Sequence, residues 1–511
     1  MEMLYFYLIF LVSVLLIFKH IFHFNKSKLP PSPPYIPIIG HLYLIKGSIH
    51  QALQSLSSKY GPILFLRLGV RSMLVVSSPS AVEECFTKND IIFANRPRTL
   101  AGDLLTYNYR AFVWTPYGHI WRSLRRLSVV ELFSSTSVHR SSAVREDEIR
   151  TLVRHLYKVS KSGNPKVEFK YWFSICLFNT ITRIVAGRQV VPEEDAGGEA
   201  GRRIMADLRE RFFTNVGMNM CDFLPILRWF GYKGLEKKLM VAFKRRDEFL
   251  QGLLDEFRLK KMNSSSQKHV KDGKEKGPLI ETLLSLRESE PEFYTVDVIK
   301  SLMLVMFVAG TETTATTVEW AMSLLLTHPE TLDKLRTEID NNVREERLLT
   351  DMDLSKLPYL RCVINEALRL YPPVPLLLPH FSSKDCTIGG HVIPEGTILV
   401  VNSWALQRDP NVWEEPHKFK PERFEMEEEK EGFGYKFVPF GVGRRACPGV
   451  NMGMRAALLA LGTLIQCFEW EKVGQFEMEM RYNNGVTLQK AKPFEANCKP
   501  RQNFVQLLGQ L

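Results

Sequence analysis

The segment from Phe440 to Gly449 gives one cysteine distinctive surroundings. It reads Phe-Gly-Val-Gly-Arg-Arg-Ala-Cys-Pro-Gly and places glycines and arginines at fixed distances from Cys447. Gly441 and Gly443 permit a sharp turn before the sulfur. A helix beginning near Pro448 would direct its positive end and free N–H groups towards the sulfur and stabilise a thiolate. We therefore expect Cys447 to have a role beyond packing, whereas the other seven cysteines lack this setting and suit the role of small buried hydrophobes.

A second unusual stretch interrupts an apolar pattern that predicts one long helix from Ser301 to Leu326. Its middle, residues 309–317, contains a glycine and five threonines, which are poorer helix formers than alanine by up to ~1 kcal/mol each. Thr313 can donate a hydrogen bond to the carbonyl oxygen of Ala309, bend the helix and open a groove. Such a break in a consistent element indicates a functional site, although a lone threonine here could simply be a packed side chain.

Charged residues in two further segments could form a network. Glu366 and Arg369 lie three residues apart, on the same face of a predicted helix. Alone, this pair is typical of a surface salt bridge worth under ~1 kcal/mol. Arg423 follows downstream, in the segment Pro-Glu-Arg-Phe. If the three are buried together, every charge must be satisfied, and the role would be structural.

The elements that must position these residues are mainly helical. Apolar periodicity predicts helices in the 240s to 250s and over residues 298–326, 329–344, 360–370 and 450–468, with short strands over 63–68, 73–77 and 398–401. The polar segments 263–277 and 425–431 are expected to be an exposed linker and a solvated loop. Apolar residues make up 45% of the chain and charged residues 24%, the balance of a globular protein with a large core. The prediction is a mainly α fold with minor β structure.

The N-terminus predicts a membrane anchor. Residues 3–18 are uncharged, and the apolar character continues to Phe24, close to the ~20 residues that a spanning helix needs. A cleaved signal peptide fits less well, because no basic region precedes the stretch and no small-residue cleavage site follows it. The basic residues that follow favour a cytosolic location for the rest of the chain. We expect an anchor over residues 1–25, a basic, proline-rich hinge over 26–41 and one large domain over 42–511.

The net charge limits the classes of binding partner, and the cysteine content indicates the cellular compartment. The net charge of +11 suits an anionic membrane surface or an acidic protein. Nucleic acid is not expected, because the chain shows no zinc-finger spacing, RNA-binding signature or sustained basic helix. Eight scattered cysteines without a CxxC pair indicate a reducing compartment.

Several motifs occur in an order that resembles the cytochromes P-450. They are the anchor and proline hinge, W-x-x-x-R at Trp121 and Arg125, A-G-x-E-T from Ala309 to Thr313, E-x-x-R, P-E-R-F and F-x-x-G-x-R-x-C-x-G. The chain looks most like the plant microsomal clan that contains isoflavone and flavonoid hydroxylases and sesamin synthases. The resemblance implies a single large haem domain of the cytochrome P-450 fold. It also implies that haem b is bound through Cys447, whose electron-rich sulfur favours O–O cleavage.

The resemblance also assigns roles to individual residues. Glu312 and Thr313 would carry protons to dioxygen, and Glu366, Arg369 and Arg423 would form a structural triad behind the haem. His380, in a Pro-His pair, matches a propionate-binding position but could be a plain loop histidine. The remaining haem-binding residues would be Trp121, Arg125, Phe440, Gly441, Gly443, Arg445 and Gly449. The substrate pocket would draw on Met306, Ala309, Gly310, Val374, Leu378, Val486, Thr487 and the loop from about residue 98 to 113.

The implied reaction inserts one atom of dioxygen into an apolar small molecule. Because the chain has no flavin or dinucleotide fingerprint, NADPH electrons would arrive through a separate NADPH–cytochrome P-450 reductase, docked near Arg122, Arg126 and Arg444. The expected location is the endoplasmic reticulum membrane. A haem-thiolate isomerase or dehydratase and a non-catalytic haem sensor are the alternatives, and neither needs the pair Glu312 and Thr313. Flavonoids, lignans, terpenoids and indoles all remain open as substrates.

Overall fold

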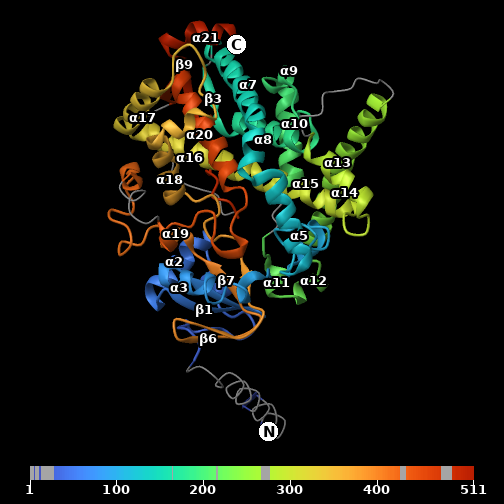
Figure 1. Cartoon of the computed structure of the whole chain (residues 1–511). Helices are drawn as coiled ribbons and strands as arrows, with labels where there is room; N and C mark the ends of the chain where they lie inside the picture. The colour runs from blue at the N-terminus through green and yellow to red at the C-terminus, as the bar shows by residue number, and fades with distance from the viewer. Residues whose placement is uncertain are drawn as a thin grey trace.

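Helices make up most of the structure. The computed structural model describes residues 28–163, 165–213, 217–265, 277–425, 433–473 and 486–511, together with Tyr5, Leu11 and Val12. Figure 1 shows a larger part built of helices and a smaller part around a sheet, with the C-terminus in the helical part. The prediction of a mainly α protein with minor β structure is confirmed.

The helices follow the apolar segments of the sequence. Those predicted near residues 329, 360 and 450 appear within two residues of their expected ends. The helices of six or more residues are α2 (Ile49–Tyr60), α3 (Pro79–Phe86), α4 (Leu100–Leu105), α5 (His119–Ser128), α6 (Ser135–Arg140), α7 (Ser142–Ser160), α8 (Phe169–Ala186), α10 (Glu199–Phe212), α13 (Leu235–Ser265), α14 (Leu279–Ser289), α15 (Val296–Gly310), α16 (Glu312–Thr327), α17 (Pro329–Asn342), α18 (Pro358–Leu370), α20 (Val450–Cys467) and α21 (Val505–Gln510).

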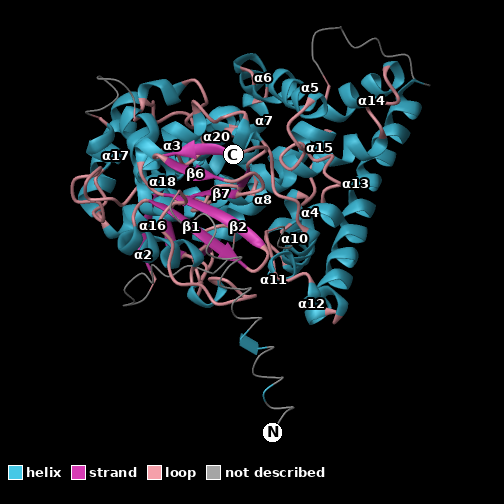
Figure 2. Cartoon of the chain, turned by 90° about the horizontal axis from the view of Figure 1, so that it is seen from below, coloured by secondary structure: helices cyan, strands magenta, loops and turns pink. Residues whose placement is uncertain are grey.

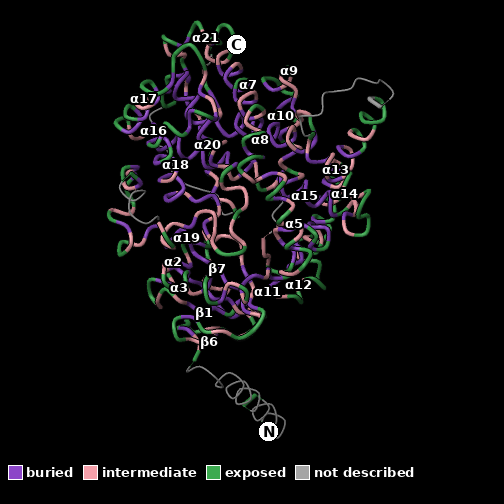
Figure 3. Tube along the Cα trace, viewed as in Figure 1, coloured by how far each residue is buried: buried purple, intermediate pink, exposed green. Residues whose placement is uncertain are grey.

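The centre of the core consists of α16 and the three helices that surround it. Helix α16 packs against α8, α18 and α20, and all four are buried over most of their length (Figure 3). Helices α8, α16 and α20 are apolar on most sides, which suits the inside of a large core. Their packing fixes the walls of the site described below.

The main sheet has four strands in the order β1-β2-β7-β4. Strands β1 (Ile63–Leu68), β2 (Arg71–Val76) and β7 (Ile398–Val401) lie side by side in Figure 2, and β4 (His380–Phe381) pairs with β7. Strand β2 pairs with β7 in parallel and with β1 in antiparallel register. The smaller sheets combine β3 (Lys166–Glu168), β9 (Glu495–Pro500) and β8 (Phe468–Lys472), and β5 (Cys386–Ile388) with β6 (His391–Ile393). The predicted strands over 63–68 and 398–401 are confirmed.

The long apolar helix predicted over residues 301–326 is interrupted. Helix α15 ends at Gly310 and α16 begins at Glu312, with Thr311 at φ −101° and ψ −64° between them. The hydroxyl of Thr311 donates to the carbonyl oxygen of Phe307 at 2.7 Å, and that of Thr313 donates to Ala309 at 2.7 Å. These bonds compete with the helical ladder, so the expected bend is confirmed and is strong enough to end the first helix.

The predicted membrane anchor lies almost entirely outside the described residues. The loop predicted over 425–431 lies outside them from residue 426 onwards, and the linker over 263–277 does so between residues 266 and 276. Within the described part, two stretches are long and apolar enough to cross a membrane: Val296–Thr327 and Val450–Cys467. Both are mostly buried in the core, so their apolar character serves packing.

Candidate active site

A largely apolar cavity of about 280 Å³ lies where α5, α8, the α15–α16 junction and α20 approach the loop before α20. Cys447 and Thr313 both line it, although they are far apart in the sequence. The walls include Met306, Ala309, Gly310, Val374 and Leu378, as predicted for the substrate pocket. The fold therefore gathers the cysteine loop, the groove and the proposed pocket around one space.

The loop that carries Cys447 is shaped by its glycines. Gly441 and Gly443 have φ values of +70° and +71°, in the left-handed region that other residues rarely adopt. A side chain at Gly443 would also collide with the carboxylate of Asp90, which would lie 2.5 Å from its Cβ. The N–H of Cys447 donates to the carbonyl oxygen of Phe440 at 2.9 Å and closes the loop.

Cys447 lines the cavity, and its side chain is accessible there. Burial raises the pKa of the thiol, while the N–H of Gly449 and the charge of Arg125 lower it. The following helix starts at Val450, where the apolar periodicity predicted it, and Pro448 and Gly449 form the turn that leads into it. The positive end of α20 still follows the sulfur directly and favours the thiolate.

A cluster of cationic and donor groups lines another part of the cavity. Burial lowers the pKa of the guanidinium groups of Arg96, Arg125 and Arg445, and repulsion between the arginines lowers that of Arg445 further. Arg96 and Arg445 donate only to backbone carbonyl oxygens, and no carboxylate in the described part of the chain pairs with any of the three. Trp121 lies 4.6 Å beneath the guanidinium of Arg445. Such a cluster fits a ligand that brings its own negative charges.

His380 joins this cluster as a neutral ring. Its Nδ1 donates to the carbonyl oxygen of Phe93 at 2.7 Å, and burial together with Arg96 holds its pKa well below the usual value. In this tautomer Nε2 can only accept a hydrogen bond. A carboxylate placed beside the ring would favour protonation, after which Nε2 could donate to it.

These residues fit an iron porphyrin. The thiolate of Cys447 would hold the iron, and Arg96, Arg125, Arg445 and Trp121 would offer cations and a donor to the propionates. The expectations for Trp121, Arg125, His380 and Arg445 thus agree with their placement in the cavity, as do those for Phe440, Gly441 and Gly449. Gly443 shapes the loop without lining the cavity.

Sequence reasoning did not identify Arg96. A buried arginine in the segment Asn-Arg-Pro has no spacing signal, because its neighbours in the cavity come from distant parts of the chain. Val486 and Thr487, in contrast, do not line the cavity. The adjacent Leu488 donates its N–H to the carbonyl oxygen of Pro373 at 2.8 Å, so this segment lies behind the cavity wall.

Glu312 and Thr313 are neighbours in sequence but face different surroundings. Thr313 lines the cavity, whereas Glu312 does not. The Oε1 atom of Glu312 lies 2.6 Å from the Nζ of Lys170 in α8, and both side chains are buried. Glu312 is therefore held behind the groove helix in this structure.

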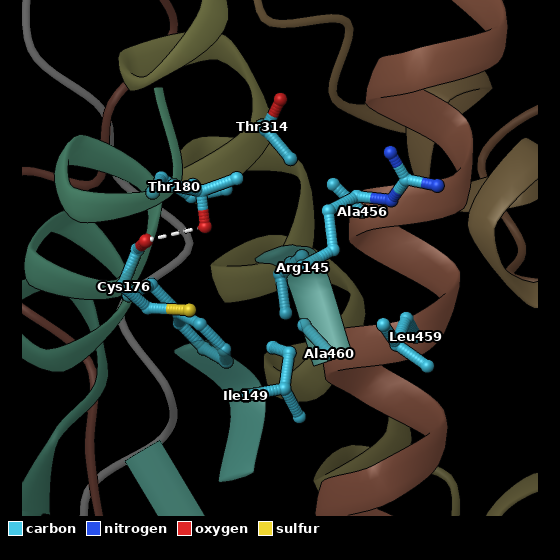
Figure 4. A pocket seen from close by; sticks show the side chains of 11 residues that line it. Arg145, Ile149, Cys176, Thr180, Thr314, Ala456, Leu459 and Ala460 are labelled. Carbon is cyan, nitrogen blue, oxygen red and sulfur yellow. Dashed lines mark hydrogen bonds between the residues drawn. The ribbon is translucent and has the colours of Figure 1, made fainter. Parts of the chain in front are cut away.

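A second, much smaller cavity of about 10 Å³ adjoins the groove behind Thr314 (Figure 4). It lies between α8, α16 and α20, and the hydroxyl of Thr180 on its wall donates to the carbonyl oxygen of Cys176 at 2.8 Å. Arg145, Leu177, Thr180, Thr314 and Ala456 line both cavities. The space is about the size of one water molecule.

The predicted triad of Glu366, Arg369 and Arg423 forms as expected. Arg369 donates to both carboxylate oxygens of Glu366, at 2.6 and 2.8 Å, and Arg423 donates to Oε1 at 3.1 Å. Glu366 and Arg369 are fully buried. The triad joins α18 to the 3₁₀ turn Pro421–Phe424, which supports a structural role.

The proposed docking arginines differ in their surroundings. Arg122 and Arg126 are exposed on α5, whereas Arg444 forms an ion pair with Asp90 at 3.0 Å. Arg444 remains 45% exposed, so it is available to a partner only in competition with Asp90.

A mainly helical fold with a cysteine, a cationic cluster and a threonine-bent helix around one apolar cavity defines a haem-thiolate enzyme. The cytochrome P450 family model matches residues 30–497, and the chain belongs to this family. The family implies a haem-iron cofactor and a monooxygenase reaction.

Plant relatives are similar over nearly the whole chain. Cytochrome P450 81Q32 of Catharanthus roseus is 46% identical, covering 95% of this chain and 94% of the relative. The (+)-piperitol/(+)-sesamin synthase of Sesamum radiatum is 42% identical, covering 100% and 99%. An isoflavone 2'-hydroxylase of Glycyrrhiza echinata is 40% identical, covering 97% of each. The resemblance stated from the sequence is confirmed.

A solved structure shares the fold. The structure of a zebra fish cytochrome P450 with progesterone has a TM-score of 0.74 and 27% sequence identity. The match covers 88% of this chain and 99% of that chain.

Proposed function

We propose that this enzyme is a membrane-anchored monooxygenase of plant specialised metabolism. It inserts one atom of O₂ into an apolar small molecule and reduces the other atom to water, consuming two electrons and two protons. The electrons come from NADPH through a separate reductase. The observation that carries this proposal is that Thr313 and Cys447 line the same largely apolar cavity.

The cavity supports selection of an apolar substrate. Met306, Ala309, Val374 and Leu378 offer apolar surface, and they share the space with the hydroxyl of Thr313. The bound haem supplies the oxidation chemistry through its thiolate-ligated iron. Relatives named for isoflavone hydroxylation and sesamin formation support flavonoid or lignan substrates, while terpenoids and indoles fit the apolar walls as well.

The residues of the groove move protons and orient the reactants. Thr313 donates its hydroxyl hydrogen to Ala309, so its oxygen lone pairs can hold a water molecule in the cavity. Glu312 supplies protons to that position after it leaves Lys170. Positioned general acids are worth ~10²–10⁴ in rate, which makes this path important to the outcome of each turnover.

The N-terminal anchor determines the cellular location of the enzyme. Residues 1–25 hold the enzyme in the endoplasmic reticulum membrane, and residues 26–41 connect them to the catalytic domain on the cytosolic side. The positive charges of Arg122 and Arg126 on α5 attract an acidic reductase surface, an interaction that weakens with salt.

The substitution Thr313→Ala tests the proton path. It removes one hydroxyl and a methyl group and leaves Cys447 in place, so haem content and substrate binding should survive. NADPH should still be oxidised, but less oxygen should enter product and more should leave as hydrogen peroxide. The measurement is product formed per NADPH oxidised, with peroxide assayed in parallel.

The matched control is Thr316→Ala, on the same helix but outside the cavity lining. It should retain the wild-type ratio of product to NADPH. Equal ratios in the two variants would show that Thr313 is only a packing residue. Absence of NADPH oxidation with a competent reductase in the wild-type enzyme would favour an isomerase, a dehydratase or a haem sensor.

A further inference from the structure

A cluster of four charged side chains is buried behind the groove helix. It consists of Lys170 from α8, Glu312 and Glu319 from α16, and Lys490 from the segment that precedes β9. Each residue is at most 8% exposed, and none lines the main cavity. Buried charges are costly unless they are paired or functional, so this cluster requires an explanation.

Lys170 is held in an unfavourable position by its carboxylate partners. It is the second residue of α8, where the positive end of the helix dipole disfavours a cation by about 0.3–1 kcal/mol. Its ammonium group lies 2.6 Å from Glu312, and its charge also acts on Glu319. The lysine is therefore paired with Glu312 and acts electrostatically on Glu319.

Glu319 lies two helical turns after Glu312, on the same face of α16. Its Oε1 accepts a hydrogen bond from the N–H of Phe494 at 3.0 Å, and the carbonyl oxygen of Phe494 accepts from the N–H of Phe169 at 3.0 Å. A single residue, Phe494, thus holds Glu319 beside the start of α8, next to Lys170. This arrangement places the second carboxylate where it can compete for the same lysine.

The surroundings of Glu319 favour its protonated form. Within the described residues its Oε2 accepts no hydrogen bond, although the side chain is fully buried. Burial raises the pKa of Glu319 and the charge of Glu312 raises it further, against the opposing effects of Lys170, Lys490 and the Phe494 N–H. Lys490 in turn lies 4.2 Å over the ring of Trp320.

We propose that Glu319 and Lys170 are positioning residues that supply and release the proton-carrying Glu312. Lys170 passes a proton to Glu312 and takes one from Glu319, so that one proton moves between the carboxylates and no electrons move. Glu312, now neutral, loses its ion pair and can turn towards Thr313, while Lys170 pairs with the ionised Glu319. Glu319 regains a proton from water before the next transfer. This inference rests on the proton-carrying role of Glu312 and Thr313 proposed above.

Substitutions at Lys170 provide the first test, on the full-length haem-loaded enzyme with reductase. Lys170→Met should lower the product formed per NADPH by about three- to tenfold, less than the loss of a direct general acid. Lys170→Arg should restore most of that ratio. The matched control is Lys300→Met, which removes another buried lysine, paired with Asp247 of α13 at 2.8 Å, and should leave the ratio unchanged.

Glu319→Gln provides the second test, because it keeps the size of the side chain and removes the titrating proton. In the wild-type enzyme, product per NADPH should fall as pH rises through the pKa of Glu319, because its proton is lost. In Glu319→Gln the ratio should be low and independent of pH over that range. An infrared band of a protonated carboxylic acid, recorded on the ferric enzyme without turnover, should disappear in this variant.

The outcomes separate this inference from the proposed function. If Thr313→Ala and Glu312→Gln lose coupling while Lys170→Met matches Lys300→Met, the proton path stands and the roles of Lys170 and Glu319 are wrong. Persistence of the infrared band in Glu319→Gln would equally overturn the role of Glu319. Unchanged coupling in Thr313→Ala would overturn the path itself.

Discussion

The arginines and the cysteine at the cavity present complementary electrostatic demands. Arg96, Arg125 and Arg445 are buried without a carboxylate partner among the described residues, and Cys447 must carry a negative charge to bind iron. Arg125 links the arginines to the cysteine, because its positive charge lowers the pKa of the Cys447 thiol. A haem with anionic propionates satisfies the arginines and uses the thiolate, which explains why both kinds of residue border one space.

Replacing Cys447 by alanine tests the ligand assignment. Cys447→Ala should abolish the spectral band that thiolate ligation gives to the reduced carbon-monoxide complex, because no other described cysteine lines the main cavity. Difference spectroscopy of the purified variant measures this. Cys362→Ala, at a fully buried cysteine of α18, is the control and should keep the band. A thiolate band that survives in Cys447→Ala would refute the assignment.

Among the elements, α16 and α18 show how polar groups inside helices acquire a role. The threonines at the start of α16 break the helix and shape the groove, while Glu366 of α18 binds Arg369 and Arg423. The triad connects a core helix to the 3₁₀ turn Pro421–Phe424. Loss of one member leaves the other charges buried and unpaired.

Glu366→Gln should therefore destabilise the protein by about 3–5 kcal/mol, because Arg369 and Arg423 keep their charges in a buried site. The free energy of unfolding, from urea denaturation of the enzyme, measures the effect. Glu199→Gln removes the exposed partner of Arg203 and should change stability by less than ~1 kcal/mol. Equal effects in the two variants would mean that the triad contributes no more than a surface pair.

At the scale of the whole molecule, we propose that membrane attachment and catalysis use different parts of the chain. The two apolar stretches that are long enough to cross a membrane are mostly buried in the described core. Trp229 and Phe230, which precede α13 in the chain, are 88% and 79% exposed and are apolar residues at the surface. The anchor predicted at the N-terminus is thus the main candidate for membrane attachment.

Deleting residues 1–24 should move most of the protein from the membrane to the soluble fraction and preserve haem binding, because the cavity is built from residues 96–457. Fractionation and the carbon-monoxide spectrum measure the two properties. Some membrane attachment should remain through Trp229 and Phe230. Loss of haem binding on deletion would show that the anchor is part of the catalytic fold.

The sequence determined the features that depend on local patterns. The apolar periodicity located α17, α18 and α20, the threonines located the bend, and the spacing around Cys447 singled out the cysteine that lines the main cavity. These signals are readable because helical periodicity, side-chain bonds to a nearby carbonyl and a tight glycine turn each involve residues only a few positions apart. None of these local patterns predicted that the segments would line one cavity.

The tertiary structure alone decided which distant groups are neighbours. Arg96 joined the cationic cluster, Val486 and Thr487 fell behind the cavity wall, and Lys170 paired with Glu312 across two helices. The burial of Glu319 and the repulsion of Arg445 by Arg96 and Arg125 followed in the same way. The physical reason is that burial and electrostatic interaction depend on distance in space, and helix packing sets those distances between residues far apart along the chain.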